Sequence, residues 1–499
     1  MDLNQLKNAP QREFDLCIVG SGPAGLSLAS QFFDTDISVV ILESGPVDPS
    51  EQHDKLNHCI STGVREVDGV NSRLRCFGGA GRLWAGVCAP MSNSDFEGYP
   101  HLGINGWPIS LSDLDDHYES AAELLQVNIS SFSKPVDVLS TQVGDAFPKL
   151  ELNGVKANIY AKARAKDLSK VLKRRFLGAR NIKILTNATV LDFNASNGHI
   201  GSVVTSTIGG KKFDIKARYF ALCTGALEVP RLLLASSLYA DLDVPKHLGR
   251  NFMSHPAFTK LANITLFNDG RSCVNKRGGE YNVDYELFEK DIEAADILRH
   301  NISMSPIYSL KGKGTNAEKN FAANLGIRSK MEELFCRLIG KRQWSQSWSV
   351  SIGIEQEPLL QRQLQLANQV DELGMQKLII DAGSISPLEK KTIFEALKGL
   401  GRSLVMGRIG VLEASQTFLS DEYLNRQDPI NHHIGTTKMG SNKDAGVVDE
   451  NLKIFDFKNI YISSSAVFPT SSNVNPTFTI VALSLRLGSH LKKRIQENV

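Results

Sequence analysis

The feature that most constrains the fold is a glycine-rich turn between two apolar segments near the N-terminus. The segment FDLCIV has the length and apolar character of a buried parallel strand, and GSGPAG follows it directly at residues 20–25. A helical pattern, LSLASQFF, comes next, and a second apolar segment, ISVVIL, ends at Glu43. A strand, a G-x-G-x-x-G turn, a helix and a strand with an acidic end are together typical of a dinucleotide-binding fold.

Each glycine of this turn has its own expected role. Gly20 permits the tight turn, Gly22 lets the backbone approach a pyrophosphate, and Gly25 allows the helix to pack closely. The phosphates would lie at the helix N-terminus, and Glu43, about 20 residues further on, would hold a ribose hydroxyl. The alternative is an accidental glycine-rich turn, against which the two flanking strands and the acidic residue argue.

Composition limits the classes of partner. The 499 residues are 42% hydrophobic and 22% charged, as in a globular chain with room for two domains. The net charge of +2 favours neither nucleic acid nor an anionic membrane, which leaves a small molecule as the expected partner. No apolar run approaches the roughly 20 residues of a membrane helix, and the N-terminus has no apolar core, so we expect no membrane span and a cytoplasmic protein.

The cysteines indicate a reduced protein without a metal site. Seven cysteines are scattered along the chain and never form a C-x-x-C pair. Their odd number and spacing argue against a disulfide framework, a zinc site or a dithiol redox pair. We expect buried thiols.

Only one dinucleotide is expected, because no second strand-associated G-x-G-x-x-G follows the first. The turn alone does not separate NAD from FAD. Four blocks do so by resemblance: IVGSGPAG; CFGGAGRLWAGVCAPMSNSDFE with GWPISLSDLDDHYESAAELL; ALCTGALEVPRLLLAS; and the long C-terminal segment that begins HHIGTTKMG. In this order they resemble the glucose-methanol-choline (GMC) oxidoreductase family, most closely its sugar-oxidising, pyranose oxidase-like members. The resemblance implies FAD.

The resemblance also implies a fold and its domains. We expect an α/β fold, with a Rossmann-type FAD-binding domain and a second, α+β substrate domain built on an antiparallel sheet. The FAD-binding domain would comprise residues 1–92, 165–252 and 428–499, and the substrate-binding domain residues 93–164 and 253–427. Residues 253–427 resemble the family much less.

Two catalytic residues follow from the same resemblance. The family's H-x-x-G-T histidine lies over the flavin and corresponds to His432, while the family's second His or Asn position corresponds to Asn475. A neutral imidazole can accept a hydroxyl proton, and an amide can donate to a developing alkoxide. Capping of the following helix is the alternative role for Asn475. We expect His433 to be a packing residue and His255 to be structural.

The expected cofactor-binding residues come from several separate parts of the chain. Pro476 and Thr477 should begin a helix whose positive end faces the flavin, and the Ser464 hydroxyl could donate to a phosphate. The full set is Gly20, Ser21, Gly22, Pro23, Ala24, Gly25, Glu43, Ser44, Gly78, Gly79, Trp84, Val190, Gly225, Ser464, Ala466, Pro476 and Thr477.

One departure from the family pattern concerns how FAD is held. Sugar-type relatives commonly have G-G-S-S-N-H-W where this chain has GGAGRLW at residues 78–84, and some family members attach FAD covalently through a histidine near this point. Leu83 cannot form that bond, so we expect non-covalent FAD. Arg82 could contact the flavin or an anionic substrate, or point outward.

The substrate domain is expected to contain a half-buried strand at QSWSVSIGIE and a strand-turn-strand over LQLANQVDELGMQKLIID. Trp344, Trp348 and Phe258 are pocket candidates, although aromatic residues in such strands more often belong to the core. Residues 311–319 are expected to form a mobile loop.

The basic stretch 162–180 has apolar residues at helical spacing and is expected to be a solvated helix face; attraction of an anionic substrate or an acidic partner is the alternative.

The sequence therefore predicts an FAD-dependent oxidoreductase. It would oxidise a CH–OH group of a sugar, glycoside or polyol to a carbonyl by hydride transfer to flavin N5, with His432 as general base. The electron acceptor, whether oxygen, a quinone or a protein, is left open. One alternative is a flavin-bound, non-redox lyase on the same scaffold. Another is a non-catalytic flavoprotein, against which the presence of both His432 and Asn475 argues.

Overall fold

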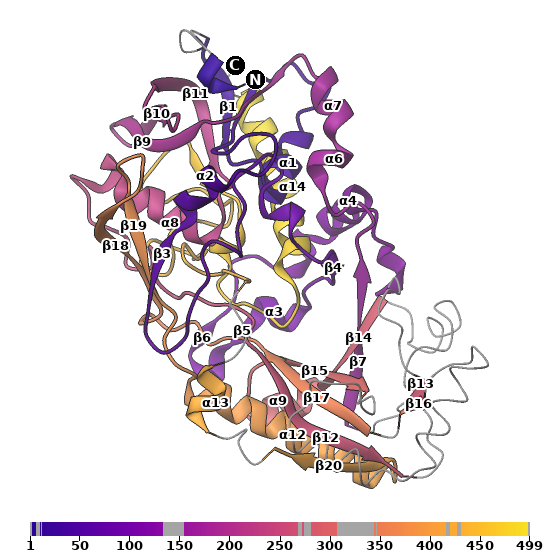
Figure 1. Cartoon of the computed structure of the whole chain (residues 1–499). Helices are drawn as coiled ribbons and strands as arrows, with labels where there is room; N and C mark the ends of the chain where they lie inside the picture. Colours follow the sequence, from indigo (N-terminus) through magenta and orange to yellow (C-terminus); the bar gives the residue numbers. More distant parts are fainter. Residues whose placement is uncertain are drawn as a thin grey trace.

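Strands from the beginning, middle and end of the chain form one seven-stranded sheet in the upper part of the molecule (Figure 1). This computed structural model describes residues 2–5, 10, 12–132, 154–267, 272–273, 281–306, 344–345, 347–415, 420–426 and 431–497. Parallel pairing joins five strands in the order β8-β2-β1-β11-β21. The sheet continues with β10, which pairs antiparallel with β11, and with β9, which pairs antiparallel with β10. The bounds are β1 (Phe14–Val19), β2 (Val39–Leu42), β8 (Ile182–Leu185), β9 (Thr189–Ser196), β10 (His199–Ser206), β11 (Lys212–Leu222) and β21 (Ile460–Ile462).

Helices α1 (Pro23–Ser30) and α14 (Pro476–Glu497) pack against each other beside this sheet (Figure 1). The helix α4 (Asp115–Leu125) covers α14 in turn, and the rings of Tyr118 and Phe478 lie 5.1 Å apart. Helix α14 begins at the predicted proline, whose missing N–H and fixed φ suit a first helical position. Its buried side chains, which include Phe478, Val481 and Leu485, fix the helix in the core of this region.

A second seven-stranded sheet forms the lower part, and every pairing in it is antiparallel. Helix α12 (Pro387–Met406) packs on this sheet (Figure 1). The strand order is β20 (Gly410–Ala414), β12 (Ala257–Leu266), β17 (Ser347–Ile354), β15 (His300–Pro306), β14 (Tyr281–Leu287), β7 (Val155–Lys162) and β4 (Val87–Cys88). The predicted combination of a Rossmann-type domain with an antiparallel, sheet-rich substrate domain is confirmed.

The alternating segment QSWSVSIGIE forms β17, as predicted. Val350 and Ile352 are fully buried, and Trp348 and Phe258 belong to the same core cluster. These two aromatic residues are therefore core residues and not pocket residues. The Trp344 side chain and residues 311–319 lie outside the described residues.

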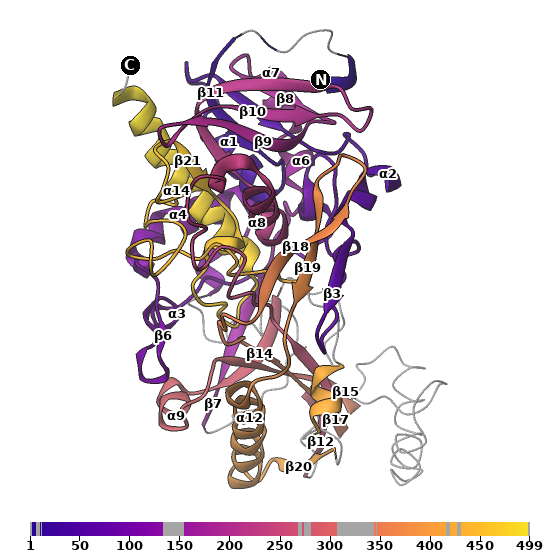
Figure 2. The ribbon, with the colours of Figure 1, turned by 90° about the vertical axis from the view of Figure 1, so that its left-hand side faces the viewer.

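The predicted strand-turn-strand over 363–381 forms the hairpin β18 (Gln363–Val370) and β19 (Gln376–Asp381). Although 363–381 falls within the predicted substrate-binding ranges, β19 pairs with β3 (Cys59–Thr62) of the N-terminal part, in parallel register. In both views these three strands run along one side of the molecule between the upper and lower sheets (Figures 1 and 2). The hairpin thus connects the two regions.

The basic stretch forms the end of β7 and the short helices α6 (Leu168–Val171) and α7 (Lys173–Gly178). Leu168, Leu172 and Phe176 are buried, whereas all the basic residues of α6 and α7 are exposed. This is the predicted solvated helix face, except that Val171 is also exposed. Within the described residues, no helix is long and apolar enough to cross a membrane.

Candidate active site

A cavity of about 500 Å³ lies where the parallel strands of the upper sheet end. Val19 at the end of β1, Leu42 at the end of β2, and Cys223 just after β11 all line it. The other walls come from residues 71–75, from the start of α8 (Gly225–Ala235), and from the chain before and at the start of α14. The carboxyl edge of such a sheet is the usual place for a ligand in a doubly wound fold.

The three glycines of the turn meet different surroundings. Gly20 has φ +99°, and a Cβ there would come within 2.8 Å of the Cys223 carbonyl oxygen. A Cβ on Gly25 would lie 2.0 Å from the Gly20 carbonyl oxygen, so only glycine lets α1 pack against the turn. A Cβ on Gly22 would meet no atom within 4 Å, although this residue lines the cavity. The space at Gly22 is therefore available to a bound molecule.

Glu43, at the end of β2, is held by the turn itself. Its Oε2 accepts hydrogen bonds from the Ser21 amide at 3.0 Å and the Ser21 hydroxyl at 2.5 Å, and its Oε1 accepts from the Gly45 amide at 2.9 Å. Burial raises the pKa of this carboxyl, against the opposing effect of these donors. Glu43 still lines the cavity, so its carboxylate is both fixed and reachable by a ligand.

Most of the predicted site residues line this cavity. They are Gly20, Ser21, Gly22, Pro23, Ala24, Glu43, Ser44, Gly79, Trp84, Val190, Gly225, His432, Ser464, Asn475, Pro476 and Thr477.

Three predicted residues do not line it. Gly25 packs α1 on the turn, the Gly78 amide donates to the Ser21 hydroxyl, and the Ala466 amide donates to the Ser464 hydroxyl. Their contacts support neighbours that do line the cavity.

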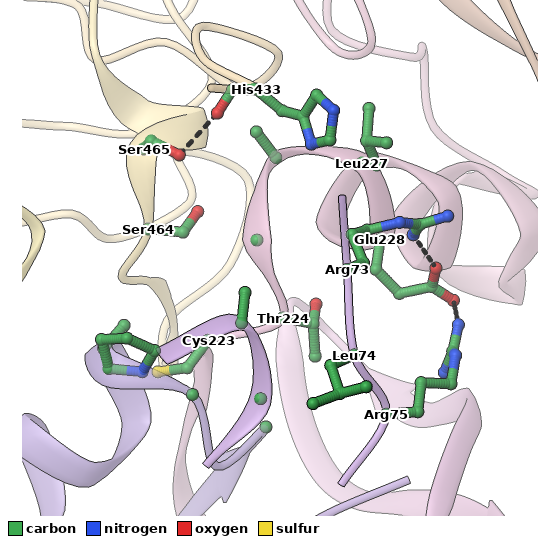
Figure 3. Close-up of a pocket in the computed structure, with 18 of the residues that line it drawn as sticks. Arg73, Leu74, Arg75, Cys223, Thr224, Leu227, Glu228, His433, Ser464 and Ser465 are labelled. Atoms are coloured by element: carbon green, nitrogen blue, oxygen red, sulfur yellow. Dashed lines mark hydrogen bonds and ion pairs between the residues drawn. The ribbon is translucent and has the colours of Figure 1, made fainter. Parts of the chain in front are cut away.

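One wall of the cavity carries a buried ion-pair cluster that is absent from the sequence predictions. Figure 3 shows Glu228 between Arg73 and Arg75; its carboxylate lies 3.1 Å from Arg73 Nη1 and 2.9 Å from Arg75 Nη2. Arg231 adds a third ion pair at 3.0 Å. Burial alone would raise the pKa of Glu228, but the three guanidinium groups outweigh burial and lower it. The cluster joins the segment 73–75 to α8.

The cavity fits a dinucleotide such as FAD. Two buried polar atoms in its walls, Asn57 Nδ2 and Thr224 Oγ1, have no hydrogen-bond partner among the described residues. Buried polar groups are normally paired, so these atoms favour a ligand with polar parts. Apolar Val190 and Leu227 line the same cavity and suit the flat faces of aromatic rings. The residues present therefore match both kinds of surface that FAD presents.

His432 lines the cavity and contacts a second histidine. Its Nδ1 lies 2.9 Å from Nδ1 of His255, and the two rings are nearly perpendicular at 80°. On its other side, His255 Nε2 lies 2.9 Å from the carbonyl oxygen of Ser471. Burial, together with the neighbouring His255 and His433, lowers the pKa of His432 to about 3. His432 is therefore a neutral imidazole at physiological pH.

His433 has a different environment from His432. Its carbonyl oxygen accepts from the Ser465 hydroxyl at 2.6 Å, and its ring centroid lies 6.0 Å from that of Phe252. The residue is buried, yet it also lines the cavity, where Figure 3 shows it on the same side as Ser464 and Ser465. His433 is thus buried, as a packing residue would be, and is also part of the cavity wall.

Asn475 directly precedes α14 and ends a loop that the lower region anchors at several points. The Ser472 amide donates to Glu355 Oε1 at 2.9 Å, and the Gln356 amide donates to the Ser471 hydroxyl at 3.0 Å. Asn473 Nδ2 donates to Glu286 Oε1 at 3.0 Å. Contacts across the junction of the two regions therefore set the position of Asn475.

The Arg82 guanidinium contacts other groups of the protein, outside the cavity. Its guanidinium donates to the Val47 carbonyl oxygen at 3.1 Å and lies near the carboxylates of Asp48 and Asp167, at 3.8 and 4.0 Å. Arg82 does not line the cavity, whereas the adjacent Leu83 does.

The glycine turn, the acidic strand end, the cavity at the carboxyl edge of the upper sheet and the second, antiparallel sheet define a flavoprotein oxidoreductase fold with a Rossmann-type FAD-binding domain. Two models of GMC oxidoreductases match the chain, at residues 158–257 and 384–484. In both of these segments the chain resembles the GMC oxidoreductase family, whose members bind FAD.

Individual relatives are distant. Choline oxidase of Arthrobacter globiformis is 20% identical over 97% of this chain and 95% of its own length. The fructose dehydrogenase large subunit of Gluconobacter japonicus is 24% identical over 63% of this chain. That match spans 54% of the subunit, so the chain corresponds to about half the length of this relative.

Solved structures agree on the fold. Pyridoxine 4-oxidase from Mesorbium loti has a TM-score of 0.58 at 17% identity, over 96% of this chain and 99% of that chain. Formate oxidase has a TM-score of 0.55 at 14% identity, over 98% and 99% of the two chains.

Proposed function

We propose that the protein is an FAD-dependent oxidoreductase that oxidises a CH–OH group of a sugar, glycoside or polyol to a carbonyl. The observation that carries this proposal is that His432 and Asn475 line the same cavity as the glycine turn. A base and a hydrogen-bond donor therefore share one space with the residues suited to a dinucleotide.

The residues that would hold FAD lie along the cavity. The N-terminus of α1 with Gly22 suits the pyrophosphate, and Glu43 suits a ribose hydroxyl. Pro476 and Thr477 place the positive end of α14 at the cavity, where it would favour negative charge on the flavin. When bound, FAD would supply the hydride acceptor at N5.

Oxidation of an alcohol removes the hydroxyl proton and a hydride from the adjacent carbon. His432 is neutral and can accept the proton, an effect that typically contributes about 10²- to 10⁴-fold to the rate. The Asn475 amide can donate a hydrogen bond to the oxygen as its negative charge develops. The two side chains thereby act on the same substrate oxygen.

The polar groups near His432 support the proposed class of substrate. Asn431, Ser465 and Asn475 all line the cavity, and each offers an uncharged donor and acceptor. Such groups suit a neutral molecule with several hydroxyl groups. The fructose dehydrogenase subunit, which is named for a sugar, supports the same class.

Anaerobic mixing tests the proposal. The FAD-loaded protein is mixed with a panel of sugars, glycosides and polyols, and the flavin absorbance near its visible maximum is followed. We expect at least one substrate to bleach the flavin, and air or a quinone to restore the colour, which also identifies the electron acceptor. Turnover with an unchanged flavin spectrum would show a lyase instead, and binding without turnover would show a non-catalytic flavoprotein.

A further inference from the structure

His255 lies directly behind the proposed base. From the sequence we expect only a structural role for His255, yet its ring connects His432 to the loop that ends at Asn475. One ring nitrogen is 2.9 Å from His432 Nδ1, and the other is 2.9 Å from the Ser471 carbonyl oxygen. Both nitrogens of His255 are thus used, and the hydrogens on them can be assigned.

The assignment starts from the carbonyl group. A carbonyl oxygen only accepts, so His255 Nε2 carries a hydrogen and donates it to Ser471. Burial lowers the pKa of His255, so its ring is neutral and its Nδ1 carries a lone pair. His432 Nδ1 must then donate to His255 Nδ1. A neutral His432 with its hydrogen on Nδ1 has its lone pair on Nε2.

We propose that His255 is a positioning residue for the reaction: it holds the Nδ1 hydrogen of His432, so that the Nε2 lone pair is available to the substrate hydroxyl. This inference rests on the proposed function, in which His432 is the base. Without an acceptor behind it, His432 would divide between two tautomers, and the one with hydrogen on Nε2 cannot accept the proton at that atom.

The pair can also share the charge that the reaction creates. The substrate O–H bond breaks as the Nε2–H bond of His432 forms, which leaves His432 positively charged. Its Nδ1–H can then pass to His255 Nδ1, so that the charge moves to His255 and His432 becomes neutral again. The groups facing His255 favour this, because the backbone of Ser471 and Ser472 and the carboxylate of Asp95 all raise its pKa against burial. At His432, burial and the neighbouring His433 oppose a charge.

The first test needs no substrate. NMR of protein labelled with ¹⁵N-histidine distinguishes protonated from unprotonated ring nitrogens, and His432→Asn and His255→Gln variants assign the two rings. We expect His432 to carry its hydrogen on Nδ1 and His255 to carry it on Nε2. A His432 ring protonated on Nε2 in the wild-type protein would overturn the proposal.

The second test measures anaerobic flavin reduction in variants at His255. His255→Leu removes the acceptor, whereas the Gln side chain of His255→Gln can accept from His432 and donate to Ser471. We expect His255→Leu to slow flavin reduction by at least about tenfold, and His255→Gln to recover much of this loss. The acid limb of the pH–rate profile should move to lower pH in His255→Leu, because a neutral His255 that accepts the Nδ1 hydrogen favours the protonated form of His432. It should stay closer to that of wild type in His255→Gln, which keeps an acceptor.

His247→Gln is the matched control. Like that of His255, the His247 ring joins a backbone carbonyl, that of Asp444, to a side chain, but this side chain is that of Asn251 and not that of His432. This variant should reduce flavin at the wild-type rate. Wild-type rates and pH profiles in both His255 variants would overturn the inference while leaving the proposed function intact. If no alcohol bleaches the wild-type flavin, the proposed function itself fails.

Discussion

Two glycines of the turn, three residues apart, are required for different reasons. At Gly25 the missing side chain lets α1 pack on the turn, whereas at Gly22 it leaves space in the cavity. Sequence motifs predict both positions, and the structure separates what each contributes. The same holds for His432, which the H-x-x-G-T pattern identifies, whereas nothing in the pattern reveals its contact with His255, 177 residues earlier.

The two glycines should therefore respond differently to alanine. Gly25→Ala should destabilise the apoprotein, because its Cβ would lie 2.0 Å from a carbonyl oxygen. Gly22→Ala should leave the apoprotein as stable as wild type but lower its FAD content, because its Cβ enters open space that the cofactor would use. Thermal unfolding of the apoproteins and the ratio of FAD to protein measure the two effects. Equal FAD content in Gly22→Ala and wild type would contradict this role of Gly22.

Replacement of the base should affect chemistry more than binding. His432→Ala should slow anaerobic flavin reduction by about 10²- to 10⁴-fold, because the proposed acceptor of the hydroxyl proton is removed. FAD content should stay close to that of wild type, because the turn and Glu43 are untouched. Stopped-flow absorbance gives the rate, and the spectrum of the purified protein gives the FAD content. A rate within threefold of wild type would remove His432 from the proposed role.

At the scale of elements, the loop before α14 depends on a buried network in the lower region. Glu286 on β14 accepts from Asn473 of this loop and pairs with Arg299 at 2.9 Å and Lys156 at 3.2 Å. Burial alone would raise the pKa of Glu286, but Arg299 and Lys156 lower it to about 2. The sequence predicts the helix that follows the loop, because Pro476 marks its start. It does not predict the network, because the partners are brought together only by the pairing of β7, β14 and β15.

The lowered pKa of Glu286 gives a stability that depends on pH. The contribution of Glu286 to the free energy of unfolding is fully present above its unfolded-state pKa of roughly 4.3. It is lost as the pH falls toward the folded-state pKa of about 2. Glu286→Gln should lower the free energy of unfolding at pH 7 by roughly 3 kcal/mol and make its decline in acid shallower. Denaturant unfolding at pH 7 and pH 3.5 measures both effects. Glu372 is exposed, so Glu372→Gln should have the wild-type free energy of unfolding at both pH values. If the free energy of unfolding of Glu286→Gln declined in acid as steeply as that of wild type, the prediction would be contradicted.

At the scale of the whole molecule, the sequence predicts the layers better than the connections. The first βαβ unit, the C-terminal helix and the alternating strand β17 follow from local patterns. The pairing of β19 with β3 does not, because the two strands are more than 300 residues apart and each has several apolar segments it could match. The sequence does not predict the Arg73–Glu228–Arg75 cluster for the same reason. Its members come from separate segments that only the complete fold brings together.

The way in which the molecule holds FAD is also a property of the whole cavity. We predict non-covalent binding, because Leu83 lines the wall at residues 78–84, where some relatives bond the flavin through histidine. Among the described lining residues, the only histidines and cysteines are His432, His433 and Cys223, and burial raises the pKa of the Cys223 thiol far above its ordinary value. Acid or heat denaturation should release yellow FAD into the supernatant. Colour that stays with the precipitated protein would show a covalent bond.

The seven-stranded upper sheet has a consequence for how the protein is made. Its strand β21 and the helix α14, which starts at the cavity, come from the last part of the chain, while the glycine turn comes from the first. During translation the dinucleotide pocket stays without one wall until residues 460–497 have left the ribosome. Flavin capture therefore requires that residues 460–497 have been translated, and a chain truncated before them would have an open sheet edge and an incomplete pocket.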